Sequence, residues 1–188
     1  MRVVSTAEPI VKAPSLADMA VVRRVDIDDY SDVRYVHVAA FKAFAAPQLS
    51  EDEVKAFVAH VNAPDYADQL REMDMLVALV NNQLVGTAAW IAGDDSGASA
   101  RISSVFVDPM FAQCGIGRRL VLETEHLAVQ AGFGRFTVRA TANAVPFFLS
   151  LGYEIASHGV SSISVAEGAI PITFLRKAAT AAGRDFAA

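Results

Sequence analysis

Apolar residues recur every three or four positions in three long stretches of this chain, the spacing expected for one buried face of a helix. The stretches cover residues 33–44, 54–61 and 116–131. The first is expected to end before Pro47, because proline cannot continue a helix. The second follows Ser50–Glu53, whose first and last residues form a capping-box pattern. Three amphipathic helices are therefore predicted, with a further turn or two of helix before residue 73.

Shorter runs, rich in β-branched and apolar residues and bounded by turn-forming residues, indicate strands. They cover residues 20–25, 75–80, 84–91, 100–107, 136–140, 153–156 and 170–176. Asn81 and Asn82 tolerate the left-handed conformation of a tight turn, so the second and third runs are predicted to form a hairpin. With a short helix at 143–151, the order is β-α-α-β-β-β-α-β-α-β-β. This order predicts an α/β (α+β) protein, with helices on both faces of one mixed sheet.

The chain of 188 residues fits a single domain. Residues 1–19 show neither helical nor strand periodicity and are expected to be an N-terminal extension, and residues 93–97 are expected to turn. Residues 20–178 are expected to form the domain. An alanine-rich tail over residues 179–188 is expected to be helical or loose.

The composition argues against several classes of protein. A net charge of −5 argues against nucleic-acid binding, which normally needs a basic face. Although 53% of residues are apolar, no run is long enough to span a membrane, and no secretory signal is evident at the start, so a cytoplasmic protein is expected. A single cysteine, Cys114, excludes an internal disulfide and a multi-cysteine metal site, and no histidine pair has ligand spacing, so no metal is expected.

The segment Val105–Gly117 carries the first chemical signal. An apolar strand runs there into a glycine-containing turn and then into a helix. Backbone N–H groups at such a helix start bind phosphate well, and Gly115 and Gly117 let a ligand approach because they lack Cβ. A phosphate-bearing ligand is therefore expected.

A second motif, Asn143–Tyr153, follows at a defined distance and reads Asn-Ala-Val-Pro-Phe-Phe-Leu-Ser-Leu-Gly-Tyr. Together with the loop, it resembles the GNAT superfamily of acyl-CoA-dependent N-acyltransferases, whose motifs are written Gln/Arg-x-x-Gly-x-Gly/Ala and Asn-x-x-x-x-Phe-Tyr-x-x-x-Gly-Phe. The resemblance covers about residues 21–177. It implies a mostly antiparallel sheet whose central strands splay to bind coenzyme A.

By this resemblance, acetyl-CoA is the cosubstrate and an amine the acceptor, and the pantetheine arm lies along residues 105–107 like an extra strand. The residues implied to contact the cofactor are Val105, Phe106, Val107, Gln113, Cys114, Gly115, Ile116, Gly117, Arg118, Asn143, Phe147 and Phe148. The implied activity is transfer of an acetyl group to a primary amine of a small molecule or protein. The alternatives are an acyl-CoA-binding sensor without transferase activity and a non-catalytic interaction protein without affinity for CoA.

Two departures from the family pattern concern the chemistry. Ala112 takes the place of the usual Gln or Arg, which leaves the phosphate grip to backbone groups, with Arg118 or Arg119 as a side-chain substitute. Phe148 takes the place of a tyrosine thought to protonate the leaving thiolate, and phenylalanine has no proton to give.

The sequence identifies only some of the catalytic groups. The backbone N–H of Val107 or Phe106 is expected to stabilise the oxyanion. The candidates for an acid or base are Tyr153, Glu154 and His158, just past the second motif, and water is the alternative.

Several of these residues also fit other interpretations. The two glycines also fit a simple tight turn, whereas a nicotinamide loop would need a third glycine at Leu120. Cys114, at a helix start, also fits a nucleophile, although no histidine is near in sequence. His37, His60 and His126 are expected to be surface or hydrogen-bonded histidines on helices.

The acceptor site is expected between residues 44–49 and the loop 157–168. Phe44, Phe57, Trp90 and Tyr153 are candidates to line it. A homodimer would use the last strand, which should lie at or near a sheet edge.

Overall fold

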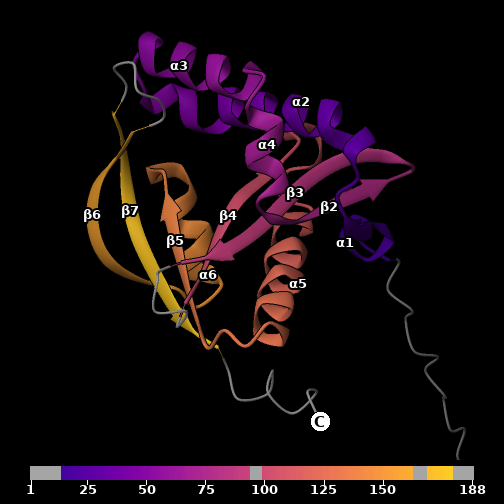
Figure 1. The fold of residues 1–188 in the computed structure, drawn as a ribbon. Helices are drawn as coiled ribbons and strands as arrows, with labels where there is room; N and C mark the ends of the chain where they lie inside the picture. Colours follow the sequence, from indigo (N-terminus) through magenta and orange to yellow (C-terminus); the bar gives the residue numbers. More distant parts are fainter. Residues whose placement is uncertain (1–13, 94–98, 163–168, 180–188) are drawn as a thin grey trace, which may run out of the picture.

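The computed structural model describes residues 14–93, 99–162 and 169–179, which fold around one seven-stranded sheet (Figure 1). The strand order is β1-β2-β3-β4-β5-β7-β6. Strands β4 and β5 run parallel, and the other neighbours in this sheet are antiparallel. The strands are β1 (Val21–Arg24), β2 (Asp74–Val80), β3 (Gln83–Ala92), β4 (Ala100–Val107), β5 (Arg135–Ala140), β6 (Glu154–Ser162) and β7 (Ala169–Ala178).

Helices cover both faces of the sheet. They are α1 (Leu16–Met19), α2 (Tyr30–Ala40), α3 (Glu51–Asn62), α4 (Tyr66–Arg71), α5 (Ile116–Gln130) and α6 (Val145–Ser150). Alternate residues of β2 point to opposite faces: Met75 and Val77 pack with α2, while Leu76 packs with Ile116 and Leu120 of α5. The predicted mixed sheet with helices on both faces is therefore confirmed.

Local sequence signals explain several element boundaries. The Ser50 side chain accepts a hydrogen bond from the N–H of Glu53, whose carboxylate accepts one from the N–H of Ser50, so the predicted capping box begins α3. Asn81 and Asn82 both have positive φ, at 51° and 64°, and they join β2 to β3 in the predicted hairpin.

Three segments differ from the elements that the sequence predicts. Residues 16–19 form the helix α1, whose capping box joins Ser15 and Asp18, although no helical period was evident in so short a segment. The helical path from α2 does not end before Pro47, because a π-helical turn at Phe41–Ala45 and a 3₁₀ turn at Ala46–Gln48 carry it past the proline. Proline is tolerated at the start of the 3₁₀ turn, where its missing N–H is not needed.

Strand β6 is the third difference, because it continues past Ala156 to Ser162 instead of giving way to a loop. Its polar and small residues lack strand-like alternation, and its pairing with β7 makes the strand. The last strand, β7, lies next to the edge, which is formed by β6. The predictions for residues 1–13, for the turn around 94–97, for the loop at 163–168 and for the tail at 180–188 lie outside the described residues. None of the helices among the described residues is long and apolar enough to span a membrane.

Candidate active site

Strands β4 and β5 separate part of the way along their length. Ala100–Ile102 pair with Phe136–Val138, and in the described residues no pairing continues beyond them. The rest of β4, residues 103–107, and the end of β5 therefore face each other with unpaired backbone edges. Such edges can accept an extended ligand by main-chain hydrogen bonds. The expected splay between the central strands is confirmed.

A β-bulge shapes the free part of β4. One residue of β3, Ala88, lies opposite two residues of β4, Ser104 and Val105, and Ser104 has a φ of +50°. The bulge releases the carbonyl of Ser104 from the regular ladder, and the hydroxyl of Thr87 donates to it at 2.6 Å. A side chain of β3 thus holds the irregular backbone in place.

The same threonine ends a buried chain of polar side chains. Tyr66 Oη lies 2.6 Å from Nδ1 of His37, and His37 Nε2 lies 2.9 Å from Thr87 Oγ1. Because the Thr87 proton is donated to Ser104, its oxygen must accept from Nε2–H, and Nδ1 must accept from the tyrosine hydroxyl. Complete burial lowers the pKa of His37 from 6.5 to about 3, so the ring is neutral. His37 is thus a hydrogen-bonded histidine, as expected.

The N–H groups of β4 can be assigned to its two edges. The N–H of Asp108 donates to the carbonyl of Val85 in β3 at 2.8 Å. Successive N–H groups of a strand alternate between its edges, so that of Phe106 also faces β3, whereas that of Val107 faces the gap toward β5. Of the two residues expected to donate to an oxyanion, Val107 has the N–H on the open side.

The segment after β4 forms the predicted strand-loop-helix turn. Gln113 and Gly115 have positive φ values of +59° and +83°, and Gly115 is the N-cap of α5. The first hydrogen bond of α5 joins the N–H of Arg119 to the carbonyl of Gly115. The N–H groups of Ile116, Gly117 and Arg118 therefore precede the helical ladder, as phosphate binding by a helix start requires.

The side chains of this loop have distinct environments. Ile116 is buried against the sheet, and the Cys114 thiol is 3.4 Å from the carbonyl oxygen of Ala112. Arg119 donates to the carbonyls of Ala17 and Ala20, at 2.6 and 2.7 Å, so it is engaged in holding α1 on α5. Arg118 and Arg119 are the two side chains expected to replace the Gln or Arg that is absent at Ala112. Of these two, Arg119 is engaged with α1 and Arg118 is not.

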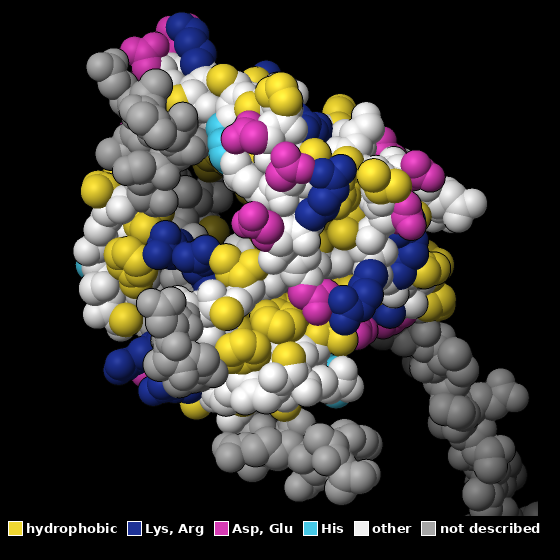
Figure 2. Space-filling view, in the orientation of Figure 1, with side chains coloured by type: hydrophobic (Ala, Val, Ile, Leu, Met, Phe, Trp, Pro, Cys, Tyr) yellow, Lys and Arg dark blue, Asp and Glu magenta, His cyan; other side chains and the backbone are white. Residues whose placement is uncertain are grey.

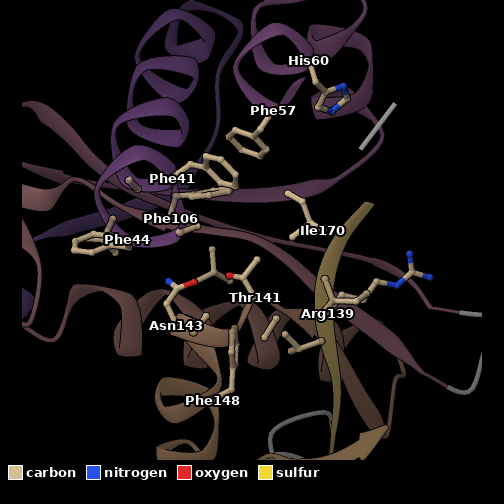
Figure 3. Close-up of a pocket in the computed structure, with 18 residues that line it drawn as sticks. Phe41, Phe44, Phe57, His60, Phe106, Arg139, Thr141, Asn143, Phe148 and Ile170 are labelled. Atoms are coloured by element: carbon tan, nitrogen blue, oxygen red, sulfur yellow. The ribbon is translucent and has the colours of Figure 1, made fainter. Parts of the chain in front are cut away.

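The second motif forms a 3₁₀ turn at Ala142–Ala144 followed by α6. Asn143 lines the cavity between the splayed strands, and its Oδ1 is buried without a hydrogen-bond partner (Figure 3). Phe148, only 4% exposed, lines the same cavity, while Phe147 packs beside it and near Gly117. A buried amide oxygen without a partner costs free energy unless a ligand satisfies it.

The cavity has a volume of about 380 Å³. The free part of β4 lines it with Val105, Phe106 and Val107, and the end of β5 with Val138, Arg139 and Ala140. Phe41 and Phe44 of the π-helical turn and Phe57 and His60 of α3 lie on the side of Phe106, across from Asn143 and Phe148, and Ile170 and Ile172 of β7 complete the lining (Figure 3). Segments from both halves of the chain therefore enclose a largely apolar space at the end of the gap.

The structure does not bring four of the sequence candidates to this cavity: Tyr153, His158, Glu154 and Trp90. The hydroxyl of Tyr153 donates to Glu125 at 2.8 Å, and Lys177 pairs with the same carboxylate at 2.7 Å. Burial and the Glu125 charge raise the pKa of Tyr153. His158 lies on β6, with Nδ1 3.1 Å from Thr173 Oγ1.

Glu154 begins β6 and lines a different surface hollow, and Trp90 packs against Phe133. Glu154 and Trp90 therefore also lie away from the cavity. Phe44 and Phe57, which are expected to line the acceptor site, do line the cavity.

His60 lines the cavity, although its sequence context did not predict this. It is three residues after Phe57 on α3, and its ring meets that of Tyr66 edge to face with centroids 5.1 Å apart. The spacing from Phe57 already placed His60 on the inward face of α3. Among the described lining residues, His60 and Arg139 are the titratable groups.

Comparison with known proteins gives one family and many related folds. A family model described as an acetyltransferase (GNAT) domain matches residues 45–162. No curated protein matches the sequence.

Solved structures share the fold at low sequence identity. A GCN5-related N-acetyltransferase from Rhodopseudomonas palustris superimposes with a TM-score of 0.77 and 23% identity, covering 86% of this chain and 96% of that one. The PaiA N-acetyltransferase of Thermoplasma acidophilum, solved with coenzyme A, gives 0.67 and 16%, covering 85% and 99%. The ribosomal-protein-S18-alanine N-acetyltransferase of Escherichia coli gives 0.58 and 15%, covering 85% and 94%.

Proposed function

Because the chain belongs to the GNAT acetyltransferase family, we propose that it transfers an acetyl group from acetyl-CoA to a primary amine of a small molecule or a protein. The observation that carries this proposal is the gap between β4 and β5, which opens beside the start of α5 and ends at the apolar cavity. An elongated thioester fits that path, with phosphates at one end and a reacting carbonyl at the other.

The residues present fit such a cosubstrate. The first N–H groups of α5 would bind the pyrophosphate, and the unpaired edge of β4 would bind the amides of the pantetheine arm. Asn143 Oδ1 is a buried acceptor without a partner in the protein, and an amide N–H of the arm would satisfy it. The related PaiA acetyltransferase was solved with coenzyme A, which supports the same use here.

The chain supplies one group that would stabilise the oxyanion and one that would accept the proton of the amine. The N–H of Val107, on the open edge of β4, would stabilise negative charge on the carbonyl oxygen. His60 would accept the proton of the amine, directly or through water, because it is the described lining residue whose side chain can act as a base. No acid is needed for the thiolate to leave, since a free thiol has a pKa of about 8.5. Phe148 therefore does not preclude turnover.

Two measurements test the proposal. Acetyl-CoA at 100 times its dissociation constant should stabilise the protein by about 2.7 kcal/mol, visible as a thermal shift. Thiol release from acetyl-CoA should then depend on an added amine, measured over a panel of acceptors. An absence of both effects would contradict the proposal.

The second candidate is an acyl-CoA-binding module without transferase activity. Phe148 favours it, because this side chain lines the cavity and cannot protonate a thiolate. This candidate predicts the thermal shift with acetyl-CoA and no thiol release with any amine. The pair of measurements therefore separates the two functions.

A further inference from the structure

One wall of the cavity is aromatic and aliphatic. Phe41 stacks on Phe57 with ring centroids 3.7 Å apart, and Ile170 and Ile172 pack against the same pair of helical segments. Phe44 remains 40% exposed at the cavity (Figure 3). A molecule that meets a thioester carbonyl at the end of the gap would place the rest of its body against this wall.

The described lining residues offer no carboxylate to a bound cation. None of them is acidic, although the whole chain carries a net charge of −5, and Figure 2 shows acidic and basic side chains interspersed on the outer surface. Arg139 contributes to the lining, but its guanidinium points away from the cavity and lies 5.8 Å from the centroid of the Phe174 ring (Figure 3). A second ammonium group here would lose water without gaining a carboxylate partner.

We propose that the acceptor is a primary amine with one positive charge and an apolar body, and that polyamines are excluded. The inference rests on the proposed function and names the substrate class of the same site. The apolar body is stabilised by leaving water for the wall of Phe41, Phe44 and Phe57. The reacting nitrogen loses a proton, and with it the positive charge, before it attacks the thioester. It therefore needs no permanent carboxylate partner, whereas a second ammonium group would.

A rival occupant of the wall is a long acyl chain on the thioester. We assign the wall to the acceptor because its residues come from the turn after α2, from α3 and from β7, whereas the gap itself is formed by β4 and β5. The two occupants predict different substrates. A wall for an acyl chain would make hexanoyl-CoA a better donor than acetyl-CoA.

The test compares hexylamine with 1,6-diaminohexane, which has the same carbon chain and one more ammonium group. With acetyl-CoA as donor, kcat/KM from thiol release is expected to be at least about tenfold higher for hexylamine, although the diamine offers two reacting nitrogens. A parallel series compares acetyl-CoA with hexanoyl-CoA at fixed hexylamine. Acetyl-CoA is expected to be the better donor.

Two variants locate the effect at the wall. Phe44→Glu provides a carboxylate for the second ammonium group and is expected to shift the ratio of the two kcat/KM values at least tenfold toward the diamine. The control is Tyr35→Glu, which adds the same charge at an exposed position of α2 outside the cavity lining and should leave the ratio unchanged.

The outcomes separate this inference from the proposed function. Turnover in which the diamine equals or exceeds hexylamine would overturn the substrate class alone. Preference for hexanoyl-CoA would do the same, by assigning the wall to the acyl chain. Thiol release from neither amine, nor from any other in the panel, would overturn the proposed function and this inference with it.

Discussion

Nε2 of His37 lies 2.9 Å from Oγ1 of Thr87, and this contact determines which nitrogen of the buried imidazole carries the proton. The hydroxyl of Thr87 has a single proton, which it donates to the carbonyl of Ser104 in the bulge. Its oxygen therefore accepts a hydrogen bond from Nε2–H of His37. The ring also lies against Phe106, with centroids 4.3 Å apart. A neutral histidine thus supports the part of β4 that borders the cavity.

Burial of His37 predicts how stability depends on pH. Its pKa falls from 6.5 to about 3 on folding, so between these values the unfolded chain binds a proton that the folded protein does not. The contribution of neutral His37 to stability is therefore fully present above pH 6.5 and is lost as the pH falls toward 3. Between pH 6.5 and 5, wild type should lose about 2 kcal/mol more than His37→Gln. Denaturant unfolding at both pH values measures this, and equal losses would contradict it.

Thr87→Val removes the hydroxyl that links His37 to the bulge while nearly preserving shape. It leaves Nε2–H of His37 and the carbonyl of Ser104 without partners, which should cost about 2 to 4 kcal/mol in the free energy of unfolding. Thr87→Ser is the matched control, because it retains the hydroxyl. If both variants are equally stable, the chain of hydrogen bonds does not hold the bulge.

Most of the fold could be predicted because local signals agreed with tertiary packing. The capping box at Ser50 and the paired asparagines before Gln83 act over a few residues and require no partner elsewhere in the chain. Strand β6 could not be delimited, because its polar residues form a strand through pairing with β7. Helix α1 has only four residues, and its position depends on carbonyl contacts from Arg119, about a hundred residues away.

The start of α5 gives a prediction for cofactor binding. A Cβ at Gly117 would meet Val107 Cγ2 at 3.4 Å and Phe147 Cζ at 3.5 Å, which are ordinary contacts, so a Cβ at this position displaces no neighbour. Gly117→Val is expected to abolish acetyl-CoA binding by filling the approach to the N–H groups. Gln113→Ala should weaken binding only a few-fold, because the backbone provides the main contacts. Calorimetric titration measures both, and normal binding by Gly117→Val would contradict this account of the loop.

His60 and His158 form a natural pair of variants. His60→Gln should lower kcat/KM by about 10², as expected for loss of a general base. His158→Gln should have little effect, because His158 contacts Thr173 on the edge pair of strands and does not line the cavity. An unchanged kcat/KM in His60→Gln would leave water as the base.

Phe148→Tyr adds a hydroxyl to a side chain that lines the cavity. We expect kcat to rise about tenfold, through protonation of the leaving thiolate, with little change in acetyl-CoA affinity. Single-turnover thiol release measures the chemical step. An unchanged rate would show that the hydroxyl does not reach the sulfur or that the thiolate leaves unassisted.

The site was only partly predictable, for a reason visible in its members. The loop and the Asn143 motif are continuous segments, so their sequence alone marked them. His60 reaches the cavity because α3 packs on α2, and the distance along the chain from His60 to Phe106 gives no sign of it. Tyr153 follows directly after the second motif, yet its side chain turns to Glu125, which a sequence neighbour cannot reveal.

Only three residue pairs join β4 to β5, and this junction coincides with a division of the chain. β1 to β4 come from residues 21–107, and β5 to β7 from residues 135–178, with α5 packing on strands of both groups. We expect the unliganded protein to have two groups of amides that exchange with solvent at different free energies. A bound ligand spanning the junction would make them exchange as one cooperative unit.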